Sequence, residues 1–273
     1  MLEEIAEALL LDCFCSSIKL LPINFSVWWK FKGKKKNGIM INLALKMETH
    51  NFRFHEGAVH MCTGATGSGK TRRIREYLRH KNILFENGEQ LYHVIFYYAL
   101  WQREYDEIQR EFEGTTLSID WVNNPAPTNN EFEERASAHT RSINIIDDGM
   151  SKISEELLSI VTVTARHLKA TTFLLFQSLF PPHRLARQIS LNTKYFHIHK
   201  NPREQNQIQV LARQIQPRNN EYIVQAYEKA TEEPYSIFLI DLMQTTPENY
   251  RFRSHILPRE LPMVAYVSRK KKK

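Results

Sequence analysis

Short apolar runs alternate along this chain with segments in which apolar residues recur every three or four positions. The apolar runs predict β-strands at residues 58–63, 91–99, 117–122, 143–147, 171–177, 194–199 and 235–242. The segments between them predict helices at residues 69–80, 102–112, 152–166, 204–214 and 221–231. This alternation predicts an α/β fold, in which a mostly parallel sheet is covered on both faces by helices.

The first 50 residues do not follow this alternation. Residues 3–11 form an amphipathic helical pattern, and residues 25–31, with Trp28 and Trp29, have the composition of a strand. We therefore expect three parts: an N-terminal appendage at 1–50, a main domain at 51–258 and a basic tail at 259–273.

Charge is distributed unevenly over these parts. The chain of 273 residues has a formal charge of +7, and 42% of its residues are hydrophobic, enough for a substantial core. Ten positive charges lie in two runs, at 30–36 and 269–273, so the remainder carries −3. Such runs attract nucleic acid or act as nuclear-import signals, and solvated charge is an equally weighted alternative.

The cysteines favour an intracellular compartment. Cys13, Cys15 and Cys62 are too few and too scattered for a disulfide framework or a closed zinc site. Cys62 lies in a predicted strand and is interpreted as a small buried hydrophobic residue. Acidic residues interrupt the apolar N-terminus, so we expect neither a membrane span nor a secretory signal.

One short segment has the pattern of a phosphate-binding loop. The chain has nine glycines, and three of them lie in the run Gly64, Ala65, Thr66, Gly67, Ser68, Gly69, Lys70 and Thr71. Glycine allows the backbone to wrap closely around a polyphosphate, and the loop N–H groups then face its oxygens. We expect Lys70 to bind the β- and γ-phosphates of ATP and Thr71 to ligate Mg²⁺. The strand before the loop and the helix after it are the context that this motif requires.

Two consecutive acids follow a later apolar run. A phosphate loop needs an acidic partner on a neighbouring strand, and Asp147 ends the run 143–147, where strand ends face the ligand crevice. We expect Asp147 to serve the metal and Asp148 to polarise the attacking water. The alternative to this catalytic role is a simple Asp-Asp-Gly turn that ends at Gly149. Asn144 is an unusual residue for this strand, because it is polar within an otherwise apolar run.

A glutamine ends the next predicted strand. Gln177 closes the run 171–177, at the strand end that we expect to lie beside the phosphate loop. Its amide has both a donor and acceptors, so it can bind the γ-phosphate and the attacking water together.

The order of these motifs resembles that of a known family. The segments concerned are Gly64–Thr71, Ile145–Asp148, Phe173–Pro181, Arg187–Asn192, Lys200–Arg203, Leu211–Gln214, Ala226–Thr231 and Pro234-Tyr235. Over residues 58–257 the chain resembles poxvirus-type genome-packaging ATPases of the HerA–FtsK superfamily. It is most similar to the versions in adintoviruses and in Maverick/Polinton elements. The resemblance implies a RecA-like P-loop NTPase sheet.

The resemblance also implies a function and partners. It implies a motor that hydrolyses Mg²⁺-ATP to move double-stranded DNA into a capsid. Its partners would be other copies in a hexamer-like ring and a capsid or portal-vertex protein. Its location would be the infected host cell, with the nucleus suggested by the basic tail, or the virion.

An arginine of a neighbouring subunit completes the active site in this family. Members carry a basic residue just before the strand that ends in glutamine, whereas this chain has Leu168 at the matching position. Arg166, close by, and Arg187, in a better-matched segment, are the candidates, with Arg203 as a further one.

Two other functions remain open. A nucleoside or small-molecule kinase also uses a phosphate loop, but it needs neither Asp148 nor Gln177. A scaffold that binds ATP without hydrolysis would not need the catalytic residue types that are present.

His197 and His199 point to one face of a strand, but a metal site would need further ligands, so we expect packing or surface histidines. Trp121, like Trp28 and Trp29, is interpreted as a core residue rather than a base-stacking platform.

Overall fold

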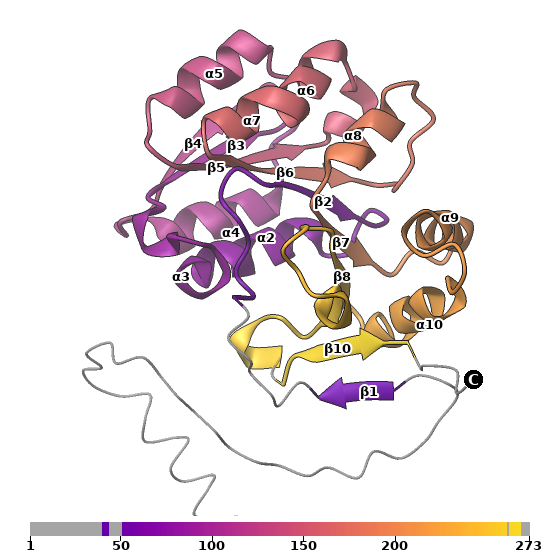
Figure 1. Cartoon of the computed structure of the whole chain (residues 1–273). Coiled ribbons are helices and arrows are strands. Elements are labelled where there is room, and N and C mark those ends of the chain that lie inside the picture. The colour runs from indigo at the N-terminus through magenta and orange to yellow at the C-terminus, as the bar shows by residue number, and fades with distance from the viewer. Residues whose placement is uncertain (1–39, 44–50, 261, 269–273) are drawn as a thin grey trace, which may run out of the picture. The chain divides into compact units, whose positions relative to one another are not determined.

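A ten-stranded sheet organises the protein in the computed structural model, which describes residues 40–43, 51–260 and 262–268 (Figure 1). Its parallel part contains, in sheet order, β4 (Ser118–Val122), β3 (His93–Tyr97), β5 (Ser142–Asp147), β6 (Ala170–Phe176), β2 (Val59–Thr63) and β7 (Tyr195–His199). Its antiparallel part continues from β7 with β8 (Ile237–Asp241), β9 (Phe252–Ser254), β10 (Val264–Val267) and β1 (Met40–Leu43). The predicted α/β class with a mostly parallel sheet is confirmed.

Each predicted strand corresponds to one of the strands β2 to β8. The last of them, β8, runs antiparallel to β7, with His197 opposite Leu239. The strands β9, β10 and β1 were not predicted, because runs of three or four residues carry too little periodicity.

Helices cover both faces of the sheet. One face carries α2 (Lys70–Arg79), α3 (Lys81–Leu84) and α4 (Arg103–Phe112). The other face carries α5 (Asn129–Ser137), α6 (Glu155–Ser159), α7 (Ala165–His167), α8 (Ala186–Asn192), α9 (Gln205–Ile215) and α10 (Glu221–Ala230). In Figure 1, α5 to α8 lie on one side of the parallel strands and α2 to α4 on the other. The predicted helix at 152–166 consists of α6 and α7, joined by a π-helical turn at Ile160–Thr164.

Two hydrophobic cores fill the space between the sheet and these helices. The strand β6 is buried along its whole length, and its side chains alternate between the cores. Phe173 and Leu175 pack toward α2, α3 and α4, whereas Leu174 and Phe176 pack toward the opposite helices. Cys62 is fully buried, as predicted.

The expected boundaries at residues 50 and 258 fall within this sheet. The strand β1 comes from the N-terminal part and pairs with β10, which comes from the C-terminal part. Several predicted features lie outside the described residues: the basic runs at 30–36 and 269–273, the elements expected at 3–11 and 25–31, and Trp28 and Trp29. The three-part division therefore stays a prediction. In the part of the chain that is described, no helix is long and apolar enough to cross a bilayer.

Candidate active site at the phosphate loop

The phosphate loop joins β2 to the first turn of α2. A Cβ atom on Gly64 would lie 2.6 Å from Ser68 Oγ and 2.7 Å from His199 Cβ, so only glycine fits there. Gly69, which precedes the first residue of α2, has φ 92°, a conformation that other residues rarely adopt. These two glycines let the loop turn tightly and leave the N-terminus of α2 open toward an anion.

Lys70 turns back into this loop. Its Nζ donates hydrogen bonds to the carbonyl oxygens of Gly64 at 2.8 Å and Ala65 at 3.2 Å. Burial lowers the pKa of Lys70, while the nearby carboxylate of Asp147 opposes this effect. The ammonium group therefore lies where the loop would enclose a phosphate.

Asp147 is the buried carboxylate of the site. Its Oδ2 accepts hydrogen bonds from Tyr105 Oη at 2.9 Å and Thr71 Oγ1 at 3.3 Å, and its Oδ1 accepts one from the backbone N–H of Asp148 at 2.9 Å. Burial raises the pKa of Asp147, and the Tyr105 hydrogen bond opposes that rise. Its donors are neutral, and no ion pair reaches Asp147 among the residues that the structure describes. The geometry suits a carboxylate that shares a divalent cation with Thr71.

The position of this acid in the sheet differs from the expectation. Asp147 was expected on a strand next to the phosphate-loop strand, but β6 lies between β2 and β5. Thr71 nevertheless reaches Asp147, because α2 runs on the face of the sheet toward which the Asp147 side chain points. The intervening strand β6 brings Gln177 between the two motifs.

Gln177 lies beside the phosphate loop, as predicted. Thr63 of β2 is in register with Phe176 of β6, and the N–H of Gly64 donates to the Phe176 carbonyl at 3.3 Å. Gln177 is the next residue along and is exposed. Its role toward the γ-phosphate and water stays a prediction.

Asp148 has a left-handed backbone conformation, with φ 59° and ψ 12°. Aspartate tolerates this conformation better than most residues do, and such positions are frequent at functional sites. Its half-buried side chain accepts a hydrogen bond from Gln102 Nε2 at 3.4 Å. A 3-10 turn begins at Gly149, so the structure has the Asp-Asp-Gly turn while the side chain of Asp148 stays accessible.

The candidate arginines are exposed and lie in different places. Arg166 is in α7, and a Cβ on Gly57, just before β2, would lie 3.3 Å from its Cα. Arg166 is therefore at the amino ends of the strands, about 16 Å of strand length from its own phosphate loop. Arg187 is in the first turn of α8, and Arg203 precedes α9. The structure of one subunit does not bring Arg166 to its own phosphate loop.

Two features beside the phosphate loop were not predicted: the hydroxyl of Tyr105 and a polar pocket. The pocket holds about 410 Å³ and lies beside Gly69 at the start of α2. Its lining includes Arg72, Arg73, Tyr235 and His255. Tyr235 is 55% exposed, and the Arg72 guanidinium lies over its ring at 5.5 Å. Two consecutive arginines directly after Lys70 and Thr71 were the available signal.

The paired strand histidines are buried packing residues. Tyr77 Oη lies 2.8 Å from His197 Nδ1, and His197 Nε2 lies 3.0 Å from His60 Nδ1. His199 lies behind Gly64, and burial lowers its pKa to about 3. In the described ranges, neither residue belongs to a group of three metal ligands. Asn144, also buried, donates to Ser142 Oγ at 2.9 Å.

Comparison with known proteins gives only remote structural likenesses. No family profile and no curated protein matches the chain. EssC (ATPases 2 and 3) of Geobacillus thermodenitrificans is similar at a TM-score of 0.37 and 11% identity over 54% of this chain and 33% of that one. The cytoplasmic domain of the type VII secretion ATPase EccC of Thermomonospora curvata is similar at a TM-score of 0.42 and 15% identity. This likeness covers 77% of this chain and 25% of that one.

The matched part of this chain thus spans a third or less of either neighbour. Because both TM-scores lie below 0.5, neither likeness determines the fold or the activity of this chain.

Proposed function

We propose that this chain is an ATP-hydrolysing motor that moves double-stranded DNA into a viral capsid. The observation that carries the ATPase part is the 3.3 Å contact between Thr71 Oγ1 and Asp147 Oδ2, with Lys70 in the phosphate loop nearby. These groups come from segments 76 residues apart, and together they match the needs of Mg²⁺-ATP. The resemblance to packing ATPases supplies the DNA, the capsid or portal-vertex protein, and the infected cell or virion as location.

Each residue has one task in this proposal. Lys70 and the loop N–H groups would bind the phosphates, while Thr71 and Asp147 would hold Mg²⁺. When bound there, Mg²⁺ would supply positive charge against the charge that develops on the phosphates. Asp148 accepts a proton from the attacking water, and Gln177 orients that water against the γ-phosphate.

The polar pocket beside Gly69 would hold the nucleoside. Its volume of about 410 Å³ is within the usual range for ligand sites. The exposed Tyr235 ring would stack on the base, and Arg72 would contact the phosphates next to the sugar. Tyr235→Ala should weaken ATP binding but leave pyrophosphate binding unchanged, because pyrophosphate has no base. Equal loss for both ligands would contradict this assignment.

A ring of subunits would complete each site. Arg166 lies at the far ends of the strands from its own loop, so in this proposal it can only serve the ATP of a neighbour. Arg187, at the start of α8, is the second candidate. An arginine supplied in trans is worth about 10³–10⁵ in turnover in related chemistry.

ATP hydrolysis with and without double-stranded DNA separates the proposed function from its alternatives. A motor should hydrolyse ATP and be stimulated by DNA. A kinase would transfer phosphate to a small acceptor and ignore DNA, and a scaffold would bind ATP without turnover. Lys70→Ala is the control: it should abolish binding or turnover and leave the fold intact, because the Lys70 ammonium donates to carbonyls of the phosphate loop and not to the core.

Mixing two inactive variants tests the ring. Arg187→Ala or Arg166→Ala subunits should bind ATP without hydrolysing it. Adding Lys70→Ala subunits should restore part of the turnover, since each variant supplies what the other lacks. Turnover that is independent of protein concentration and not restored by mixing would refute the trans arrangement.

A further inference from the structure

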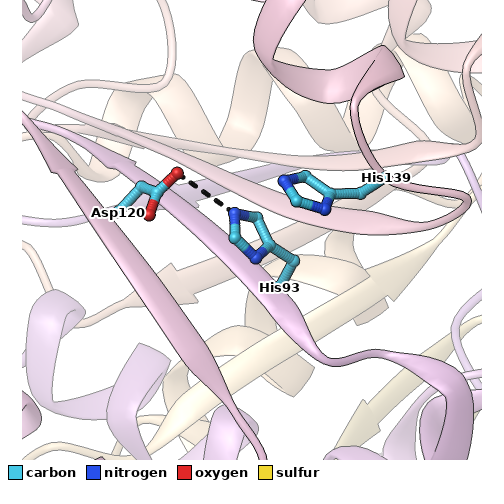
Figure 2. Close-up of side chains that lie close together, drawn as sticks. All are labelled: His93, Asp120 and His139. Carbon is cyan, nitrogen blue, oxygen red and sulfur yellow. Dashed lines mark hydrogen bonds and ion pairs between the residues drawn. The ribbon is translucent and has the colours of Figure 1, made fainter.

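We propose that His93, Asp120 and His139 form a binding site for one first-row transition-metal ion, with Zn²⁺ the best fit. The site lies on the two outermost parallel strands and is independent of the proposed ATPase function. His93 is the first residue of β3, Asp120 is in β4, and His139 lies in the connection from α5 to β5. Figure 2 shows the three side chains gathered from these separate segments.

The distances are close to those of a metal site. One ligand atom from each residue can be chosen so that all three lie within 4.8 Å of one another. His93 Nε2 is 3.1 Å from Asp120 Oδ2, and the rings of His93 and His139 are stacked with centroids 3.3 Å apart. In a tetrahedral zinc site with bonds of 2.0–2.2 Å, ligand atoms are about 3.3 Å apart. The His93–Asp120 pair already has this spacing, whereas His139 would have to turn out of its stack on His93 to aim a ring nitrogen at the same ion.

The set of ligands selects the kind of ion. Two imidazoles with one carboxylate favour Zn²⁺ and its first-row neighbours, whereas Mg²⁺ and Ca²⁺ prefer oxygen ligands alone. The His93 side chain is 13% exposed and that of Asp120 is 47% exposed, so an ion can enter from solvent. Three protein ligands leave a fourth tetrahedral position for water.

An ordinary histidine–aspartate contact explains only part of this arrangement. A proton on His93 Nε2 joins that ring to Asp120 and leaves the His139 nitrogens out. A dication can be bound by all three groups at once. Its effect would be structural, because among the described strands β4 is the last of the sheet and pairs with β3 alone. The ion would tie β4 to β3 and to the connection after α5.

Zinc titration of the chelator-treated full chain tests the proposal. Calorimetry should show one Zn²⁺ bound per chain through this site. At an excess of 100-fold over Kd, the Tm should rise by roughly 5 °C or more. Co²⁺ should give the visible absorption bands of a four-coordinate site, a readout that a histidine–aspartate pair without metal cannot produce. No binding in either titration would overturn the proposal.

Variants locate the bound ion. His139→Gln should weaken Zn²⁺ binding at least tenfold, and Asp120→Asn should also weaken it although an amide oxygen can still accept from His93. His55→Gln is the matched control, because His55 forms a pair with Glu86 at 3.0 Å outside any group of three ligands in the described residues. Unchanged binding in both His139→Gln and Asp120→Asn, or equal weakening in His55→Gln, would overturn the proposal. ATP turnover in His139→Gln should match the parent.

Discussion

Two buried aspartates, each at the end of a strand, have different hydrogen-bond partners in this fold. Asp241 ends β8 in the antiparallel part, and its Oδ2 accepts a hydrogen bond at 2.7 Å from the guanidinium of Arg253 on β9. Asp147 ends β5 in the parallel part and has only neutral donors from Tyr105, Thr71 and a backbone amide.

The difference separates a charge that is paired inside the protein from one that the proposed function assigns to a metal ion. Asp241 and Arg253 are 3% and 1% exposed, and each compensates the charge of the other inside the protein. No cation forms such an ion pair with Asp147 in the described structure; burial raises the pKa of Asp147, and the nearby Lys70 ammonium only partly opposes that rise. A buried carboxylate without an ion-pair partner is costly to keep, and the Mg²⁺ of the proposed function would reduce that cost.

The largest expected effect concerns the two adjacent acids at the end of β5. Asp148→Asn should keep Mg²⁺-ATP binding and lower hydrolysis by about 10²–10⁴-fold, because only water activation is removed. Asp147→Asn should instead weaken the Mg²⁺ dependence of ATP binding itself. A binding titration against Mg²⁺, with single-turnover hydrolysis, measures both. Identical behaviour of the two variants would show that the tasks are not divided in this way.

Stability measurements test whether Asp241 and Asp147 differ in this way. Asp241→Asn should lower the free energy of unfolding by about 3–5 kcal/mol, because it leaves the Arg253 guanidinium buried without a counter-charge. Asp147→Asn, the matched change, should cost less than about 1 kcal/mol or stabilise, since it removes a desolvated charge that has no ion-pair partner in the described structure. Urea unfolding at pH 7 measures both. Equal losses would mean that Asp147 is also part of the structural framework.

Buried histidines on the central strands should make stability depend on pH. Burial lowers the pKa of His60, His197 and His199, that of His199 to about 3. Below about pH 6.5 these histidines bind protons in the unfolded chain but stay neutral in the folded one. The free energy of unfolding should therefore fall as the pH falls toward the lowered pKa values. Between pH 7 and pH 5 the depressed pKa of His199 should contribute a loss of about 2 kcal/mol, and those of His60 and His197 should act in the same direction.

A single substitution isolates one of these contributions. His199→Leu should flatten the fall in unfolding free energy between pH 7 and pH 5 by about 2 kcal/mol. His167→Leu, at an exposed position in α7, is the control and should leave the slope as it is. If the His199 variant keeps the full slope, His199 is protonated in the folded protein and the packing described here is wrong.

The smallest expected effect concerns the hydrogen bond from Tyr105 to Asp147. Tyr105→Phe removes the hydroxyl donor 2.9 Å from Asp147 Oδ2, which should raise the pKa of that carboxyl further. Mg²⁺ needs the ionised form, so the acid limb of Mg²⁺-dependent turnover should move to higher pH, by about one unit. Tyr98→Phe is the control, since its ring packs on Tyr105 at 5.7 Å without a hydrogen bond to Asp147. A shift of the same size in both variants would remove the special role of Tyr105.

Local features of the site were predictable because they are contiguous in the chain. The phosphate loop from Gly64 to Thr71 is one segment, and Asp147 and Gln177 each end a buried apolar run whose length and composition identify a strand. The alternation of strands and helices along the chain also follows from local periodicity, which is why the predicted strands match β2 to β8 closely. The segment 186–192, now α8, is only seven residues long and has too weak a pattern to predict.

Contacts between distant segments were decided by the tertiary structure alone. The sequence by itself determined which residue types are present and which runs are buried. It did not determine that β6 lies between β2 and β5, that Tyr105 reaches Asp147 over 42 residues, or that Arg253 pairs with Asp241. The same holds for the gathering of His93, Asp120 and His139 at the edge of the sheet. The physical reason is that strand order and helix placement depend on the packing of both cores together, and no local pattern of polar and apolar residues encodes that arrangement.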